Sequence, residues 1–198
     1  MFEGKLEELK NGFKRLPGIG EKTAERLAFY LISQEKEVGL QLSELIRESI
    51  TSIQKCESCN MLSEKSPCHF CADDQRDEKT ICVVEKSQDV YLIEDTGVYK
   101  GRYFVLGNLI SPLDGIGPNH INFPKLQQLV EKEDIHEIIL AVNPSSAGET
   151  TISFLTASLQ KDGRKITRLA TGLPIGGDIE YTSKKTLASA LTYRNESK

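Results

Sequence analysis

Two Cys-x-x-Cys pairs contain the residues of this chain whose types and spacing best suit chemistry. Cys56 and Cys59 form the first pair, and Cys68 and Cys71 form the second after a short polar segment. Each pair can place two thiolates on one side of a tight turn, and two facing turns complete a tetrahedral all-sulfur site for zinc. The sequence therefore predicts one structural Zn²⁺ ion per chain, because four protein ligands leave no open coordination position.

Other uses of the same cysteines remain open at this point. They could form two structural disulfides or remain four unrelated buried thiols, and His69 could in principle replace one thiolate, although we expect it to face solvent. Nothing at the N-terminus resembles a secretory signal, so we expect a cytoplasmic protein, in which disulfides are disfavoured. Segment 56–72 is too short and polar to have a core of its own, and we therefore expect metal binding to fold it.

The composition limits the classes of function. A chain of 198 residues suggests one or two small domains, and no apolar run approaches the about 20 residues of a membrane span. The formal net charge of −4 argues against a protein that simply coats nucleic acid. Basic and acidic residues balance over 1–55, whereas the acidic excess lies in 72–198. Any contact with DNA should therefore be local.

Helical spacing of apolar residues dominates the N-terminal part. It predicts amphipathic helices over 3–16, 21–33 and 41–54, the first of them ended by Pro17. The side chains expected to face inward are Ala24, Leu27, Ala28, Leu31 and Ile32 in the second helix, and Leu42, Leu45, Ile46, Ile50 and Ile53 in the third. We expect the three helices to pack as a small bundle.

The turn between the first two helices has the composition of an anion-binding site. Gly18 and Gly20 flank Ile19, and glycine both adopts unusual backbone angles and lets a ligand approach the chain. Free N–H groups at the start of the next helix favour an anion such as phosphate. Lys22 and Arg26 lie four residues apart and share one helical face. The alternative is an ordinary helical turn with a solvated lysine and arginine.

The segment LPGIGEKTAERLA at 16–28 resembles the helix-hairpin-helix motif of DNA repair proteins. This resemblance implies sequence-independent binding to the phosphate backbone, which positions a protein without reading bases. The residues that would contact DNA are Gly18, Ile19, Gly20, Lys22 and Arg26.

Strands alternate with helices in the C-terminal part. We expect strands at 81–84, 103–106, 138–142 and 165–169, with helices at about 87–95, 124–131 and 148–159 between them, a loop at 111–117 and a final helix at 183–194. This alternation predicts the α/β class, with a parallel sheet covered by helices on both faces. Ser87 is expected to cap its helix, and Cys82 is expected to pack as a small hydrophobic residue.

Polar residues follow the first and third of these strands. Glu85 follows the first and Asn143, Ser145 and Glu149 follow the third, so all should lie at the edge where ligands of parallel sheets bind. An acid followed by a polar loop resembles a Toprim domain, the module of topoisomerases and primases. Its catalytic members carry Asp-x-Asp where this chain has Asn143 and Ser145, and magnesium usually needs such carboxylates. Catalysis is therefore not expected.

Glu85 and Asp89 suggest a different use for this edge. Together they would form an acidic patch, which favours a basic partner protein. The alternative is that Glu85 is simply a solvated acid at the end of a strand.

The order of these features over nearly the whole chain resembles the RecR family of bacterial recombination mediators. The marks are Leu-Pro-Gly-Ile-Gly at 16–20, the four cysteines at 56–71, Leu-Ile-Ser-Pro-Leu-Asp-Gly-Ile-Gly at 109–117 and a Gly-Leu-Pro-Ile-Gly-Gly-Asp tail at 172–178. Ala147 departs from the family pattern, which has glutamate there. The expected domains are a helix-hairpin-helix bundle at 1–55, a four-cysteine zinc finger at 56–72, a Toprim-like domain at 78–172 and a C-terminal oligomerisation segment at 173–198.

The resemblance also implies a function and partners. RecR-family proteins are non-enzymatic and bind DNA largely independently of sequence, as ring-shaped homotetramers that act as clamps in recombinational repair. They act with RecO and RecF to load the RecA recombinase at single-strand gaps, which implies a nucleoid-associated protein with no membrane contact. Two rivals remain: a magnesium-dependent Toprim nuclease or primase-like enzyme, and a zinc-ribbon transcription module that reads sequence.

Overall fold

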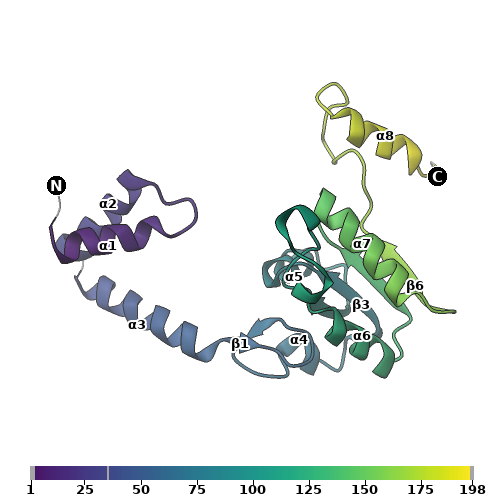
Figure 1. The fold of residues 1–198 in the computed structure, drawn as a ribbon, viewed down its shortest axis with the longest axis horizontal. Helices are drawn as coiled ribbons and strands as arrows, with labels where there is room; N and C mark the ends of the chain where they lie inside the picture. Colours follow the sequence, from purple (N-terminus) through teal and green to yellow (C-terminus); the bar gives the residue numbers. More distant parts are fainter. Residues whose placement is uncertain (1–2, 35, 197–198) are drawn as a thin grey trace. The chain divides into compact units, whose positions relative to one another are not determined.

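The computed structural model describes residues 3–34 and 36–196, and the chain divides into two compact units (Figure 1). The first unit is Met1–Ile53 and the second is Gln54–Lys198. None of the helices described is both long and apolar enough to span a bilayer. The predicted α/β class is confirmed, since helices accompany a four-stranded parallel sheet.

All regular secondary structure described in the first unit is helical. It contains α1 (Lys5–Lys14), α2 (Glu21–Phe29), the π-helical turn η1 (Tyr30–Gln34) and α3 (Lys36–Ser52). All three predicted helices are present with shifted bounds. The second continues through the π-helical turn, and the third begins at Lys36, so that Gly39 lies within its first turns although glycine disfavours a helix.

The predicted inward face of the third helix is wrong, and α3 contacts the π-helical turn η1 without burying any of its own residues. Ala24 and Ala28 of α2 are buried where α2 packs on α1, but α3 buries none of its residues. The five apolar side chains expected to face inward are between 41% and 74% exposed: Leu42, Leu45, Ile46, Ile50 and Ile53. Ile32 is also exposed. Helical periodicity correctly predicted an apolar stripe along α3, but the periodicity of a sequence does not show whether another element covers such a stripe.

The second unit begins with the cysteine-rich segment. Strands β1 (Gln54–Lys55) and β2 (Leu62–Ser63) pair antiparallel, and the short helix α4 (His69–Ala72) follows. We call residues 54–72 the finger. Its small hairpin was not predicted, because two-residue strands leave no periodic pattern in a sequence.

The main sheet has the order β4-β3-β5-β6, and all neighbouring strands are parallel. Its strands are β3 (Asp77–Val84), β4 (Gly101–Val105), β5 (Glu137–Ala141) and β6 (Lys165–Arg168), connected by α5 (Ser87–Glu94), α6 (Phe123–Lys132) and α7 (Ser146–Leu159). The 3₁₀ turns η2 (Pro112–Asp114) and η3 (Pro118–His120) occupy the loop before α6, and α8 (Lys184–Thr192) ends the unit. Strand β3 begins at Asp77, before the predicted residue 81. Its first residues are polar and exposed, so the apolar run in the sequence did not include them.

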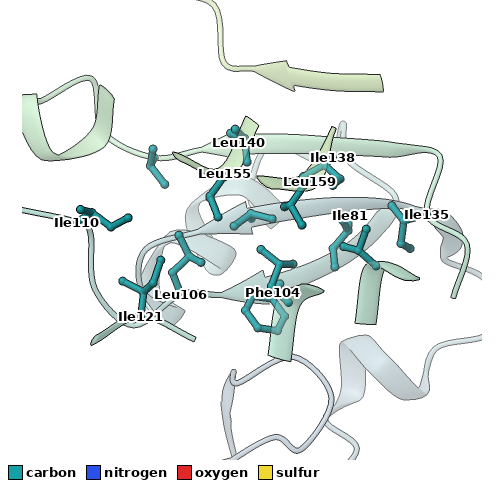
Figure 2. Packing of buried hydrophobic residues seen from close by; sticks show 14 residues of the cluster. Ile81, Phe104, Leu106, Ile110, Ile121, Ile135, Ile138, Leu140, Leu155 and Leu159 are labelled. Atoms are coloured by element: carbon teal, nitrogen blue, oxygen red, sulfur yellow. The ribbon is translucent and has the colours of Figure 1, made fainter. Parts of the chain in front are cut away.

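Alternate residues of each strand enter two separate cores. On one face, Ile81 and Val83 of β3 pack with Leu155 of α7 and with residues of α6, and Figure 2 shows side chains of this cluster pointing toward one another. On the other face, Cys82 and Val84 pack with α5 and with the finger. Helices thus cover both faces, as predicted, but the finger shares one face with α5.

The start of α5 corrects one predicted detail. Ser87 does not cap the helix, since its hydroxyl accepts a hydrogen bond from the N–H of Leu62 at 3.1 Å. Asp89 instead reaches back and accepts from the N–H of Lys86 at 2.8 Å. Ser87 therefore ties the finger to the sheet, while Cys82 is 2% exposed within the core, as expected of a small hydrophobic residue.

Candidate metal centre and nucleic-acid interface

The four cysteines of the two pairs converge in the finger. Their sulfur atoms all lie within 4.8 Å of one another, with Cys59 and Cys68 3.5 Å apart and Cys56 and Cys71 4.0 Å apart. A tetrahedron with Zn–S bonds of about 2.3 Å has sulfur–sulfur edges of about 3.8 Å. The spacing of the thiols therefore fits a zinc ion, and all five cysteines of the chain are free rather than disulfide-bonded.

Local backbone geometry closes the first of the two turns. The N–H of Asn60 donates to the carbonyl of Cys56 at 2.9 Å, and the N–H of Cys56 donates to the carbonyl of Met61 at 2.8 Å. Asn60 has φ of +61°, in the left-handed region that asparagine tolerates better than most residues. We call residues 56–60 the first knuckle.

Hydrogen bonds favour the thiolate form of Cys56. Burial by itself raises the pKa of Cys56, but backbone N–H groups of Cys59 and Cys68 more than offset it, so the pKa lies below its ordinary value. The N–H of Cys68 is 3.3 Å from that sulfur. Burial raises the pKa of Cys82 to about 12, so this fifth cysteine stays a neutral thiol. Cys56 and Cys82 thus differ in the hydrogen bonds to their sulfur atoms, although both are buried.

His69 does not join the cysteines. Its side chain is exposed, and its ring lies 3.9 Å from that of Phe70. Across residues 3–34 and 36–196, the four cysteines are the only group of three or more His, Cys, Asp or Glu side chains placed to hold a metal.

An arginine that the sequence did not indicate fastens the finger to the sheet. Arg76 donates to both carboxylate oxygens of Glu94, at 2.9 and 2.5 Å, and lowers the pKa of that carboxyl. Its guanidinium lies over the rings of Phe70 at 4.8 Å and Tyr103 at 5.6 Å. A lone arginine in a polar stretch carries no pattern from which this contact could have been predicted.

The turn between α1 and α2 is open on its outer side. Gly18 has φ of +77°, which favours glycine, and a Cβ at Gly18 or at Gly20 would meet nothing within 4 Å. Gly20 is the N-cap of α2 and has no side chain to cap the first amides of the helix. Ile19 between them is partly exposed. The turn therefore presents backbone N–H groups to an approaching anion.

Of the cations beside this turn, those of α1 form ion pairs, whereas those of α2 form none with the residues described. Lys22 and Arg26 are exposed, and the side chain of neither forms a hydrogen bond or an ion pair with a residue that the structure describes. Lys14 and Lys10 of α1 both bind the carboxylate of Glu21, with Lys10 at 3.0 Å, and they lower its pKa. Glu21 is thus occupied by α1, and Glu25 forms no ion pair with either cation, which leaves the charges of Lys22 and Arg26 available for an external anion.

The acids at the carboxyl edge of the sheet all have partners. Glu85 is half-buried and pairs with Lys86 at 3.2 Å, so a cation lies beside the predicted acidic patch. Glu149 pairs with Arg168 at 2.9 Å. Ser145, at a position where catalytic Toprim domains carry an acid, caps α7 by accepting from the N–H of Gly148 at 3.1 Å. At this edge of the sheet, Ser145 therefore has a structural role, and both glutamates have their charges paired.

Three family models match consecutive parts of the chain. Residues 6–50 match the RecR helix-hairpin-helix, residues 53–73 match the RecR four-cysteine zinc finger domain, and residues 79–170 match the Toprim domain. The four clustered cysteines together with the zinc finger match indicate a bound metal at the first site described above.

Curated relatives match almost from end to end. The Recombination protein RecR of Bifidobacterium longum subsp. infantis is 44% identical over 195 residues, which cover 98% of both chains. The protein of the same name from Gloeobacter violaceus is 44% identical over 196 residues, covering 99% of this chain and 100% of that one. The one from Staphylococcus aureus strain Mu3 is 41% identical over 191 residues, 96% of each. The expected family is confirmed: the chain belongs to the RecR family of recombination proteins, which act in DNA repair.

Proposed function

We propose that this chain is a non-enzymatic recombination mediator that binds DNA through its hairpin and acts with RecO and RecF to load RecA at single-strand gaps. The turn at Gly18, Ile19 and Gly20, with uncapped amides beside the unpaired Lys22 and Arg26, is the observation that carries the proposal. Amides and point charges suit the phosphate backbone and offer no array for reading base edges. Binding to chromosomal DNA would place the protein in the cytoplasm, associated with the nucleoid.

The test of DNA binding is the double variant Lys22→Ala/Arg26→Ala. Its affinity should fall equally for unrelated duplexes, and the slope of log K against log salt should flatten by up to about two, since about 0.9 is lost per phosphate contact. Lys5→Ala is the matched control, because Lys5 lies in the same unit but pairs with Glu8 at 2.7 Å. An unaltered salt slope in the double variant would place the DNA site elsewhere.

We further propose a homotetramer shaped as a ring that clamps DNA. Apolar side chains exposed along α3 and in the C-terminal segment support it, including Ile50 at 74%, Ile175 at 107% and Tyr181 at 85% exposure. A ring would bring several hairpins together, so that individually weak phosphate contacts add up to stable binding. Multi-angle light scattering would give the mass directly.

We propose that each chain holds one zinc ion at Cys56, Cys59, Cys68 and Cys71. The ion would be structural, because four thiolates complete its coordination and leave no site for substrate. Elemental analysis of reduced, freshly purified protein should give one zinc per chain, and a value near zero would exclude the site.

We propose that Glu85 and Asp89 bind the partner RecO. The ammonium of Lys86 pairs with Glu85 and partly neutralises its charge, so the attraction should be modest and most visible at low salt, where screening is weakest. Glu85→Ala should weaken binding to RecO in calorimetric titration and leave binding to free DNA nearly intact. Unchanged affinity for RecO would refute this role.

The Toprim match favours one alternative, a magnesium-dependent nuclease or primase-like enzyme. The pairing of Glu149 with Arg168 and the capping role of Ser145 weigh against it, because neither group is free to position a metal. Magnesium-dependent cleavage of DNA by the purified protein, abolished by Glu85→Ala, would establish the alternative.

A further inference from the structure

The first knuckle is attached to the edge of the main sheet. Strand β4 is an edge strand, and at its end the N–H of Val105 donates to the carbonyl of Cys59 at 2.8 Å. The carbonyl of Val105 in turn accepts from the side-chain amide of Asn60 at 3.3 Å. The knuckle therefore satisfies backbone groups that an edge strand would otherwise leave unpaired.

A lysine from the far side of the sheet completes this attachment. Lys125 lies in α6, which packs on the face opposite to the finger. Its ammonium donates to the carbonyl of Cys56 at 3.2 Å and to the side-chain oxygen of Asn60 at 2.8 Å. Asn60 is only 6% exposed, so both ends of its amide are used inside the protein. Lys125 thus braces the knuckle at both ends, at Cys56 and at Asn60.

The charge of Lys125 matters for a metal held by thiolates. Four thiolates and one Zn²⁺ leave a net charge of about −2 on the complex, which is costly near a protein interior. A half-buried ammonium on the backbone of one ligand lowers that cost, because charges interact more strongly where water is partly excluded. The same contact holds Cys56 in position and opposes opening of the knuckle, the step through which zinc would leave.

We propose that Lys125 is a positioning residue of the metal centre, which controls how long the finger retains its zinc. This inference rests on the structural zinc proposed above and assigns a residue outside the finger to its stability. Groups that orient metal ligands from outside the coordination sphere typically change metal affinity by about 10- to 100-fold.

The test compares Lys125→Met with Lys132→Met in the full-length protein. Lys132 lies at the other end of α6, is exposed, and its side chain forms no hydrogen bond or ion pair with any residue described, so it controls for loss of charge on the helix. The rate of zinc transfer to excess chromogenic chelator should rise about tenfold or more in Lys125→Met and stay unchanged in Lys132→Met. The absorption bands of the cobalt-substituted protein should remain those of four thiolates in both variants.

Two further substitutions of Lys125 separate the effect of its charge from the effect of its hydrogen bonds. Lys125→Gln retains a donor without the charge and takes over the test if Lys125→Met fails to fold, again with faster release expected. Lys125→Arg keeps the charge and should release zinc more slowly than either neutral variant. Equal release rates in wild type and the neutral variants would overturn this inference and leave the structural zinc standing. Wild-type protein without zinc would instead overturn the proposed metal itself.

Discussion

The two units of the chain differ most in the extent to which their apolar side chains are buried. In Gln54–Lys198, two clusters of buried residues cover both faces of the sheet, and cations such as Arg76 and Arg168 pair with nearby acids. In Met1–Ile53, Ala24 and Ala28 are buried, whereas large apolar residues along α3 face outward and two cations of α2 stay unpaired among the residues described.

The difference indicates where each unit finds its partners. In the second unit both faces of the sheet are covered within one chain, one of them partly by the finger, and exposed apolar residues such as Ile175 and Tyr181 lie in the C-terminal segment. The first unit leaves apolar area uncovered, and burying such area is worth about 25 cal/mol per Å². The assembly proposed above would bury this apolar area along α3, and the proposed contact with DNA would use Lys22 and Arg26. Four changes test this contrast, starting with the largest expected effect.

Loss of the proposed metal should lower the free energy of unfolding of the second unit. Cys59→Ser takes away one thiolate, and we expect loss of zinc and destabilisation of the second unit by about 4 kcal/mol or more, as for other lost metal sites. Zinc content and urea unfolding followed by tyrosine fluorescence would measure both. Cys82→Ala is the control, because Cys82 belongs to the same buried cluster without joining the four sulfurs, and it should retain the metal. A zinc-free Cys59→Ser protein with normal stability would contradict the expectation.

Charges placed on α3 should separate chains without unfolding them. Ile46 and Ile50 lie four residues apart on one face and are 50% and 74% exposed. Ile46→Asp/Ile50→Asp should reduce the mass by light scattering to that of smaller assemblies, with helicity by circular dichroism preserved. Leu113→Asp, in an exposed turn of the second unit, should leave the mass unchanged. The idea fails if the double variant keeps its full mass or loses its helices.

Substitution of one helical glycine in each unit compares how closely the two units are packed around these positions. A Cβ at Gly148 in α7 would lie 1.9 Å from the carbonyl oxygen of Asn143, so Gly148→Ala should destabilise the protein by about 1–3 kcal/mol. A Cβ at Gly12 in α1 would meet nothing, and Gly12→Ala should stabilise its helix by about 0.5–1 kcal/mol. Thermal unfolding would show both shifts, and shifts of the same sign would refute the contrast.

The smallest effect concerns pH and the ion pairs at the hairpin. Lys14 and Lys10 lower the pKa of Glu21 below its ordinary value of 4.5. The pairs therefore stabilise the folded state above that value, and this contribution disappears as the pH falls through the lower folded-state pKa. Glu21→Gln should be less stable than wild type near pH 6, with the gap closing in acid. Glu25→Gln, which lacks an ion pair to the residues described, should show no such pH-dependent gap.

The gap should be small because Glu21 is 54% exposed and water screens the pairs. Chemical unfolding at several pH values, monitored by helicity, would measure it. A gap that persists unchanged into strong acid would mean that Glu21 contributes through packing rather than through charge.

Much of the fold could be predicted because its signals are local. Apolar runs such as 138–142 predicted the strands, their alternation with helices predicted a parallel sheet, and helical spacing predicted most of the helices to within a few residues. Ser87 shows the limit, since its hydroxyl type suggested a cap while its actual partner lies in the finger. The type of a residue limits the hydrogen bonds that it can form, but contacts with segments far away in the chain decide which of them it does form.

The sequence by itself determined the four cysteines, the glycine-rich turn with Lys22 and Arg26, and the family, because each depends on residue types at short, regular spacing. Only the tertiary structure decided that the finger covers one face of the sheet, that Arg76 and Lys125 hold it there, and that the apolar face of α3 stays uncovered. Contacts such as that between Lys125 and Cys56 join residues far apart in the chain. Such contacts exist only after the elements pack together, because packing sets which distant surfaces meet, and no periodicity or motif in a single sequence encodes that choice.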